Sequence, residues 1–124
     1  MSGGPGRRPV NDQKEAGLKI GCHCGAMIYD SADQLPGKGH LVPDQAWLGL
    51  QEEIEAQVID PLAAGTVASE GAAMRMRRLL NAHARLMWQC RACGRIYVDG
   101  LDGELHVYAP EKDDTERQVL RGRA

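Results

Sequence analysis

The chain has 124 residues and a mass of 13.5 kDa, a length at which one domain buries roughly two-thirds of its unfolded surface. Its 15 basic and 17 acidic residues give a formal net charge of −2. This value excludes a protein whose large overall positive charge binds nucleic acid or an anionic membrane. No window approaches the roughly 18 apolar residues of a membrane-spanning helix, and the N-terminus has no apolar signal segment, so we expect a cytoplasmic protein that does not enter membranes.

Both ends of the chain are rich in charge and poor in apolar side chains. Residues 1–17 contain four glycines and two prolines without a periodic apolar residue, so they cannot repay the entropy of ordering. We expect a disordered N-terminal arm there. Residues 111–124 hold four acidic and four basic side chains, with Val119 and Leu120 as the apolar residues, and are expected to form a charged C-terminal tail. A single domain is predicted over residues 18–110.

Alternating apolar residues begin this domain. Leu18, Ile20 and Cys22 precede a short glycine-containing turn, and the alternation resumes after the turn and continues to Asp30. A period of two is typical of strands, so we predict a short hairpin. Residues 31–43, with two prolines and two glycines, are expected to form a loop.

The next segment has the spacing of a helix. Apolar residues recur at intervals of three and four from Trp47 to Val58, which predicts an amphipathic helix capped by Asp44 and ending near Pro61. Adjacent helix positions point in different directions, so Trp47 and Leu48 cannot both face one core line. We expect Trp47 to be the core residue and Leu48 to be half covered, with an exposed anchor as the alternative.

A second helix and three strands are predicted after it. Ser69 is expected to cap a helix in which apolar residues recur on one side up to about Arg85. Three short apolar runs follow, at residues 86–89, 95–98 and 105–108. These runs predict a meander. The predicted fold class is therefore α+β: a small antiparallel sheet with an inserted two-helix hairpin at about residues 44–85.

All four cysteines occur in two close pairs, each followed by glycine: Cys-His-Cys-Gly at residues 22–25 and Cys-Arg-Ala-Cys-Gly at residues 90–94. In a chain without a secretory signal, such pairs are more often metal ligands than disulfides. Two turns of this kind supply four thiolates, which close a tetrahedral shell around zinc and leave no position for a substrate. We expect a zinc-ribbon-like sheet with one structural Zn(II) per chain, held by Cys22, Cys24, Cys90 and Cys93.

Other interpretations of the cysteines stay open. Four thiolates also suit iron in a rubredoxin-like site. A thiol oxidoreductase would use Cys90 and Cys93, but such a pair normally stands at a helix N-terminus, whereas strand-like residues follow here. His23, between two expected ligands, is expected to point away from the metal. The chain has no metalloprotease, deaminase or nucleophile-elbow signature, so we expect neither an enzyme nor a small-molecule substrate.

The two predicted helices have opposite charge. Residues 44–60 contain five acids and no base, while residues 69–95 contain six arginines and one acid. Antiparallel packing with ion pairs at the rim accounts for this segregation, and a charged partner is the alternative. The residues that would meet a basic protein surface are Glu52, Glu53, Glu55 and Trp47. Those that would meet phosphate are Arg75, Arg77, Arg78, Arg91 and Arg95.

Several of these features resemble small bacterial zinc-ribbon-like proteins that are usually left as uncharacterised. The likeness spans about residues 18–109. It rests on the two cysteine turns, Asp30 and Asp33, Leu35-Pro36, the run His40–Asp44 and the run Trp88–Arg95. The resemblance implies a zinc site made of four cysteines and brings no catalytic residues with it.

These observations favour a non-enzymatic zinc-binding protein that recognises another protein through its helix pair. Within that class we expect an adaptor, a regulator or a toxin-neutralising immunity protein. A zinc ribbon that binds nucleic acid through its arginines is the alternative, and a thiol oxidoreductase is the third.

Overall fold

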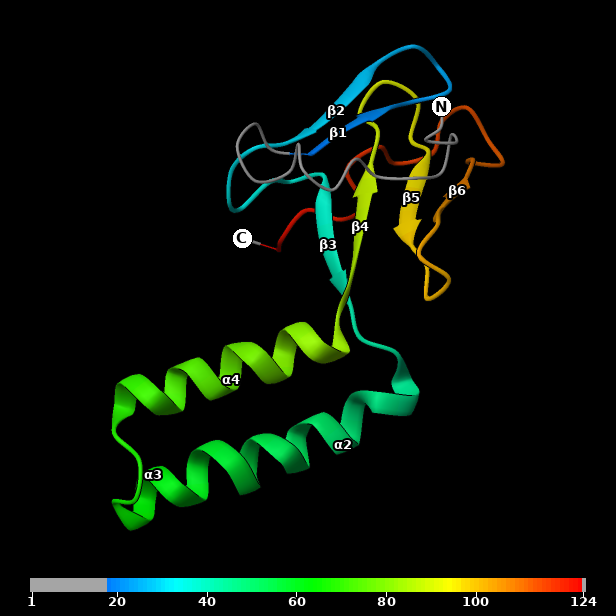
Figure 1. Cartoon of the computed structure of the whole chain (residues 1–124). Helices are drawn as coiled ribbons and strands as arrows, with labels where there is room; N and C mark the ends of the chain where they lie inside the picture. Colours follow the sequence, from blue (N-terminus) through cyan, green and yellow to red (C-terminus); the bar gives the residue numbers. More distant parts are fainter. Residues whose placement is uncertain (1–17, 124) are drawn as a thin grey trace. The chain divides into compact units, whose positions relative to one another are not determined.

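The computed structural model describes residues 18–123, so the expected arm at residues 1–17 lies outside the described residues. The chain divides into two compact units. The first, which we call the cysteine unit, contains the described residues up to His40 and those from Leu86 onward. The second, the helical unit, is Leu41–Arg85. The helical unit is therefore an insertion in the chain of the cysteine unit (Figure 1).

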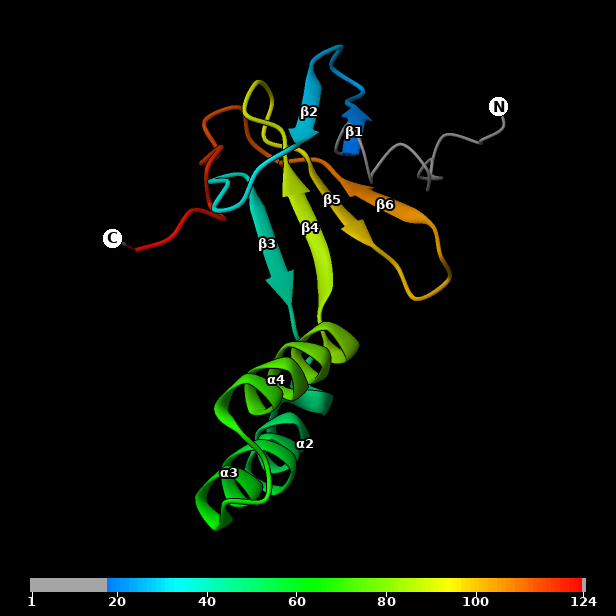
Figure 2. The same ribbon diagram turned by 60° about the vertical axis from the view of Figure 1, so that its left-hand side comes forward.

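The α+β class predicted from the sequence is confirmed. In the cysteine unit, β1 (Leu18–Gly21) and β2 (Met27–Asp30) form an antiparallel two-stranded sheet. A four-stranded sheet has the order β3-β4-β5-β6. Its strands are β3 (Lys38–Leu41), β4 (Arg85–Gln89), β5 (Ile96–Asp99) and β6 (Leu105–Tyr108). Neighbouring strands in it run antiparallel (Figure 2). The predicted hairpin thus forms a sheet of its own beside the predicted meander.

The loop predicted over residues 31–43 is wrong in part, because β3 lies within it. Pairing with β4 explains the difference. The carbonyl of Gly37 accepts a hydrogen bond from the Gln89 N–H (2.8 Å), and a Cβ added at Gly39 would lie 3.2 Å from Met87 Cγ. Tertiary pairing therefore outweighs the low strand propensity of glycine at these positions.

The core of the cysteine unit joins its two sheets. Trp88 is only 1% exposed, and its indole N–H donates to Asp30 Oδ2 at 3.0 Å. The same oxygen lies 2.9 Å from Lys38 Nζ, so one carboxylate links β2, β3 and β4. The buried cluster consists of Leu18, Ile20, Cys22, Trp88, Cys90 and Tyr97.

The helical unit is a hairpin with two arms (Figure 1). The first arm consists of α2 (Asp44–Ile54), the π-helical η1 (Glu55–Ile59) and α3 (Asp60–Ala64), and the return arm is α4 (Ser69–His83). The predicted end near Pro61 is wrong, because the first arm continues to Ala64. Pro61 follows directly on the π-helical η1, where the register of the backbone hydrogen bonds changes. Gly65, with φ at 77°, ends the arm in the left-handed region.

Asp44 and Ser69 are the first residues of their helices rather than the predicted caps. The cap positions belong to Pro43 and Ala68, whose backbones are extended, and neither supplies a side-chain hydrogen bond. An acidic side chain in the first turn still interacts favourably with the positive end of the helix dipole, which gives Asp44 a stabilising role one position later than predicted.

Few side chains of the helical unit are buried. Within it, the buried apolar residues are Leu50, Val58 and Ala72. Trp47 is 53% exposed and Leu48 is 65% exposed, so the expectation that Trp47 packs in the core is wrong. A hairpin of two helices has only one narrow seam, and Leu50 occupies it in this part of α2. No helix among the described residues is long and apolar enough to cross a membrane.

Candidate metal centre

Each cysteine pair lies in a tight turn that a glycine makes possible. The first cysteine turn is residues 22–25, where the Cys22 N–H donates to the Ala26 carbonyl (2.8 Å). The second cysteine turn is residues 90–94, where the Cys90 N–H donates to a carbonyl five residues on (2.9 Å). Gly25 and Gly94 have φ values of 99° and 87°, a region that favours glycine. In both turns, therefore, the N–H of the first cysteine donates the closing hydrogen bond and the final glycine adopts a positive φ.

The turns bring the four thiols together. All four Sγ atoms lie within 4.8 Å of one another. The Sγ atoms of Cys22 and Cys93 are 3.5 Å apart, and those of Cys24 and Cys90 are 3.7 Å apart. A tetrahedron of thiolates with zinc–sulfur bonds of about 2.3 Å has edges of about 3.8 Å, whereas a disulfide requires about 2.05 Å. The four predicted ligands are thus positioned to hold a metal ion.

The thiols differ in their electrostatic surroundings. Burial raises the pKa of the Cys90 thiol to about 12. Burial acts on Cys93 in the same direction, but hydrogen bonds from the backbone and the guanidinium of Arg95 lower the pKa of the Cys93 thiol to about 6. The Arg95 Nη1 atom lies 3.3 Å from Cys93 Sγ. The contact with Arg95 therefore favours the thiolate form of Cys93, whereas burial favours the protonated form of Cys90.

His23 lies beside the thiols without joining them. Its side chain is exposed, and it is not in the group of side chains that could hold a metal. Its backbone N–H donates to the Tyr97 hydroxyl at 3.1 Å, and the two rings meet edge to face with centroids 6.2 Å apart. Tyr97 is buried, so this contact anchors the first cysteine turn to β5.

Gln89 is a buried polar residue that was not predicted from the sequence, and it is 2% exposed. Its amide group donates to the glycine carbonyl of the second cysteine turn (3.2 Å) and to the Glu116 carbonyl (3.0 Å), and its Oε1 accepts the Val119 N–H (2.8 Å). Arg117 also donates to the Ala92 carbonyl at 2.8 Å. Part of the predicted tail is thereby held against the second cysteine turn. A polar residue within the otherwise apolar run at 86–89 was the available signal.

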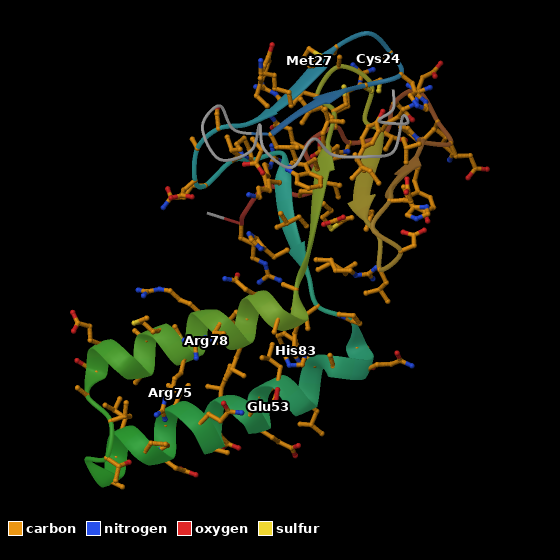
Figure 3. All side chains as sticks on the ribbon, in the orientation of Figure 1. Cys24, Met27, Glu53, Arg75, Arg78 and His83 are labelled. Atoms are coloured by element: carbon orange, nitrogen blue, oxygen red, sulfur yellow. The ribbon has the colours of Figure 1, made fainter. Side chains whose placement is uncertain are left out.

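The residues predicted to meet a protein partner lie on the first arm of the helical unit. Glu52, Glu55 and Trp47 are exposed. The Glu53 carboxylate lies 2.8 Å from His83 Nε2, and Figure 3 shows the two side chains meeting between α2 and α4. It is the one ion pair between the two arms among the described residues, and it joins a carboxylate to a histidine. The expected pairs between the arginines of α4 and the acids of the first arm are not formed there.

The five arginines predicted to meet phosphate are divided between the two units. Arg91 and Arg95 belong to the cysteine unit, whereas the other three belong to α4. Arg75 donates to the Gln57 carbonyl at 3.0 Å, and Arg95 donates to a thiol. The basic cluster as a whole stays a prediction.

The Arg95 guanidinium should matter for the metal, because it is hydrogen-bonded to a ligand sulfur. Groups that contact the ligands of a metal typically change its affinity by about 10- to 100-fold. We expect Arg95→Met to weaken zinc binding within that range, as measured by competition with a chromogenic chelator. Arg91→Met is the matched control from the same turn, since Arg91 is exposed and donates to no sulfur. Equal affinities of the two variants would show that the contact has no effect.

Comparison with known proteins adds one finding. A family model described as "Domain of unknown function (DUF8617)" matches residues 18–112, a span that includes both cysteine turns and the helical unit. No curated protein and no solved structure matches the chain. Because the matched description states no function, the expected kinship with bacterial zinc-ribbon-like proteins stays a prediction.

Proposed function

We propose that this chain, which belongs to the family described as Domain of unknown function (DUF8617), is a non-enzymatic zinc-binding protein that acts by binding another protein. The observation that carries the zinc assignment is the group of four thiols within 4.8 Å of one another. Four protein ligands leave zinc no open position for a substrate. The metal then serves folding, to which such a site contributes on the order of 10 kcal/mol, against a typical net stability of roughly 5 to 15 kcal/mol.

Zinc is preferred over the other interpretations of the cysteines. Cys90 and Cys93 stand in the turn between β4 and β5, not at the helix N-terminus that activates a redox thiol pair. Iron suits the same four ligands and is distinguished from zinc by the mass of the bound ion. A reducing cytoplasm, the compartment we propose, would keep all four thiols available for metal.

The proposed contact surface for a protein is the acidic face of the helical unit, which we define as Trp47, Leu48, Glu52 and Glu55. Leu48, Glu52 and Glu55 recur at intervals of four and three along the first arm, as residues on one side of a helix do. An exposed tryptophan beside exposed carboxylates suits a basic protein surface, because aromatic anchors supply contact area and the charges guide association. Adaptor, regulator and immunity protein are roles that fit such a surface.

Nucleic-acid binding has less support. The aromatic side chains near the second cysteine turn, Trp88 and Tyr97, are 1% and 4% exposed and offer no platform on which a base could stack. We expect fluorescent single-stranded and duplex oligonucleotides to give flat titrations at about 50 mM salt, a condition that favours binding to phosphate.

Affinity purification from the native host at low salt tests the protein partner. We expect a stoichiometric protein to bind the zinc-loaded chain and to be lost from Glu52→Lys, because the substitution reverses a charge within the acidic face. Glu104→Lys is the matched control, since Glu104 is an exposed acid of the cysteine unit. Absence of any bound protein, or equal recovery with both variants, would contradict the proposed surface.

A further inference from the structure

One edge of β2 is free in the described part of the chain. Backbone groups in an antiparallel pair face the partner strand at every second residue. Because the Cys22 N–H donates to the Ala26 carbonyl, the backbone groups of Ala26 and of each second residue after it face β1. Those of Met27 and Tyr29 therefore point the other way. Since this sheet has two strands among the described residues, they form an unpaired row of donors and acceptors.

A groove of about 370 Å³ lies against β2. Residues 26–29 line it on one side, residues 88–92 line it on another, and residues 35–38 complete it. In Figure 2, β2 lies between β1 and the loop that follows β4. Met27 and Tyr29 are 46% and 57% exposed, although they are large apolar or aromatic side chains. The groove thus combines apolar lining with a strand beside it.

The charge of the groove comes from Arg91. Its other charged lining residue, Lys38, is paired with Asp30 at 2.9 Å. Arg91 is exposed, and no carboxylate within residues 18–123 pairs with it. A ligand that complements this groove therefore brings a negative charge as well as an apolar side chain.

We propose that this groove binds an extended peptide segment of a partner protein, which adds a strand to the free edge of β2. The backbone groups of Met27 and Tyr29 would bond the peptide, an apolar side chain would pack against Leu35 and Pro36, and a carboxylate would lie beside Arg91. In such binding the backbone hydrogen bonds supply affinity and the pockets select alternate side chains. The inference goes beyond the proposed function, because it assigns a second surface, on the cysteine unit.

The test uses the zinc-loaded full chain and the peptide acetyl-Thr-Leu-Thr-Leu-Asp-Thr-amide. We expect saturable binding with amide shifts at Met27 and Tyr29. Methylating the peptide amides that face β2 should weaken binding at least about tenfold, and methylating the alternate amides should not, because only every second amide faces the neighbouring strand. A flat titration, or equal loss with both methylation patterns, would overturn the proposal.

Two protein variants separate edge binding from damage to the fold. Tyr29→Pro removes a donor from the free edge, and Lys19→Pro removes one from the outer side of β1 at the directly paired position. We expect only Tyr29→Pro to weaken peptide binding, at least about tenfold, with metal content unchanged in both. Equal weakening by both variants would contradict edge binding.

If the proline substitutions disturb the hairpin, reversing the charge of Arg91 provides a second test of peptide binding in the groove. Arg91→Glu should reverse the preference from the Asp peptide to its Lys analogue, whereas Arg77→Glu on α4 should leave it unchanged. An Arg91→Glu variant that still prefers the Asp peptide would overturn the proposal. Glu52→Lys should bind the peptide normally, so a failure of this inference is distinguishable from a failure of the acidic face.

Discussion

Cys24→Ser is expected to release the metal and unfold the cysteine unit, although Cys24 is exposed. An exposed thiol contributes little to core packing. The effect of replacing it therefore comes almost entirely from the loss of a metal ligand. We expect zinc affinity to fall by more than the about 10- to 100-fold that is typical of substitutions outside the ligand shell. Most of the folding free energy supplied by the metal would be lost with it. Zinc per chain after gel filtration measures the first effect, and hydrogen exchange of β5 amides measures the second.

His23→Ala is the matched control for this prediction. The residue adjoins Cys24, is also exposed, and lies outside the group of possible ligands. Its loss removes the edge-to-face contact with Tyr97 but no sulfur, so metal content should stay at that of the unmodified chain. Release of metal by His23→Ala, or full zinc affinity in Cys24→Ser, would contradict the ligand set.

Trp88→Ala is expected to destabilise the cysteine unit by about 3 to 5 kcal/mol, the usual cost of removing a large aromatic side chain from a core. Trp88 is 1% exposed and also donates its indole N–H to Asp30, so both packing and a hydrogen bond are lost. Trp47→Ala is the matched substitution in the helical unit, where the side chain is 53% exposed, and should change stability by only about 0.5 kcal/mol, as surface substitutions do.

Urea unfolding of the zinc-loaded chain, followed through hydrogen exchange at β4 and β5, measures this difference. Trp88→Phe keeps a smaller ring in the core and loses the bond to Asp30, so its cost combines the lost hydrogen bond with a smaller packing loss than in Trp88→Ala. A net cost of about 1.5 to 3 kcal/mol is expected from a hydrogen bond to a charged group. Equal stabilities of Trp88→Ala and Trp47→Ala would show that Trp88 does not anchor the core.

Local patterns predicted most of the fold. The hairpin at β1 and β2, both helical arms and the three strands of the meander are each visible in the apolar spacing of one continuous segment. β3 is not, because it depends on a pairing with β4 that joins residues about fifty positions apart. The helix through Pro61 was missed because η1 changes the local hydrogen-bond register.

Some parts of the candidate site could be predicted from local sequence patterns, and others could not. The four cysteines could be identified because close cysteine pairs followed by glycine are typical of metal-binding turns. The contacts of Gln89 with residues 116–119 and of Arg95 with Cys93 could not, because they depend on side-chain directions in the folded chain. The arginines of the expected basic cluster belong to different units, so the cluster stays a prediction.

Native mass spectrometry of the chain purified without added metal tests most directly whether the four thiols hold one structural zinc. The spectrum is repeated after acid denaturation and after chelation, and hydrogen exchange is followed in parallel. We predict one zinc ion per chain, with loss of protection in β4 and β5 when a chelator removes it. A metal-free chain with four titratable thiols, or with a disulfide between Cys90 and Cys93, would contradict the zinc site and favour thiol chemistry instead.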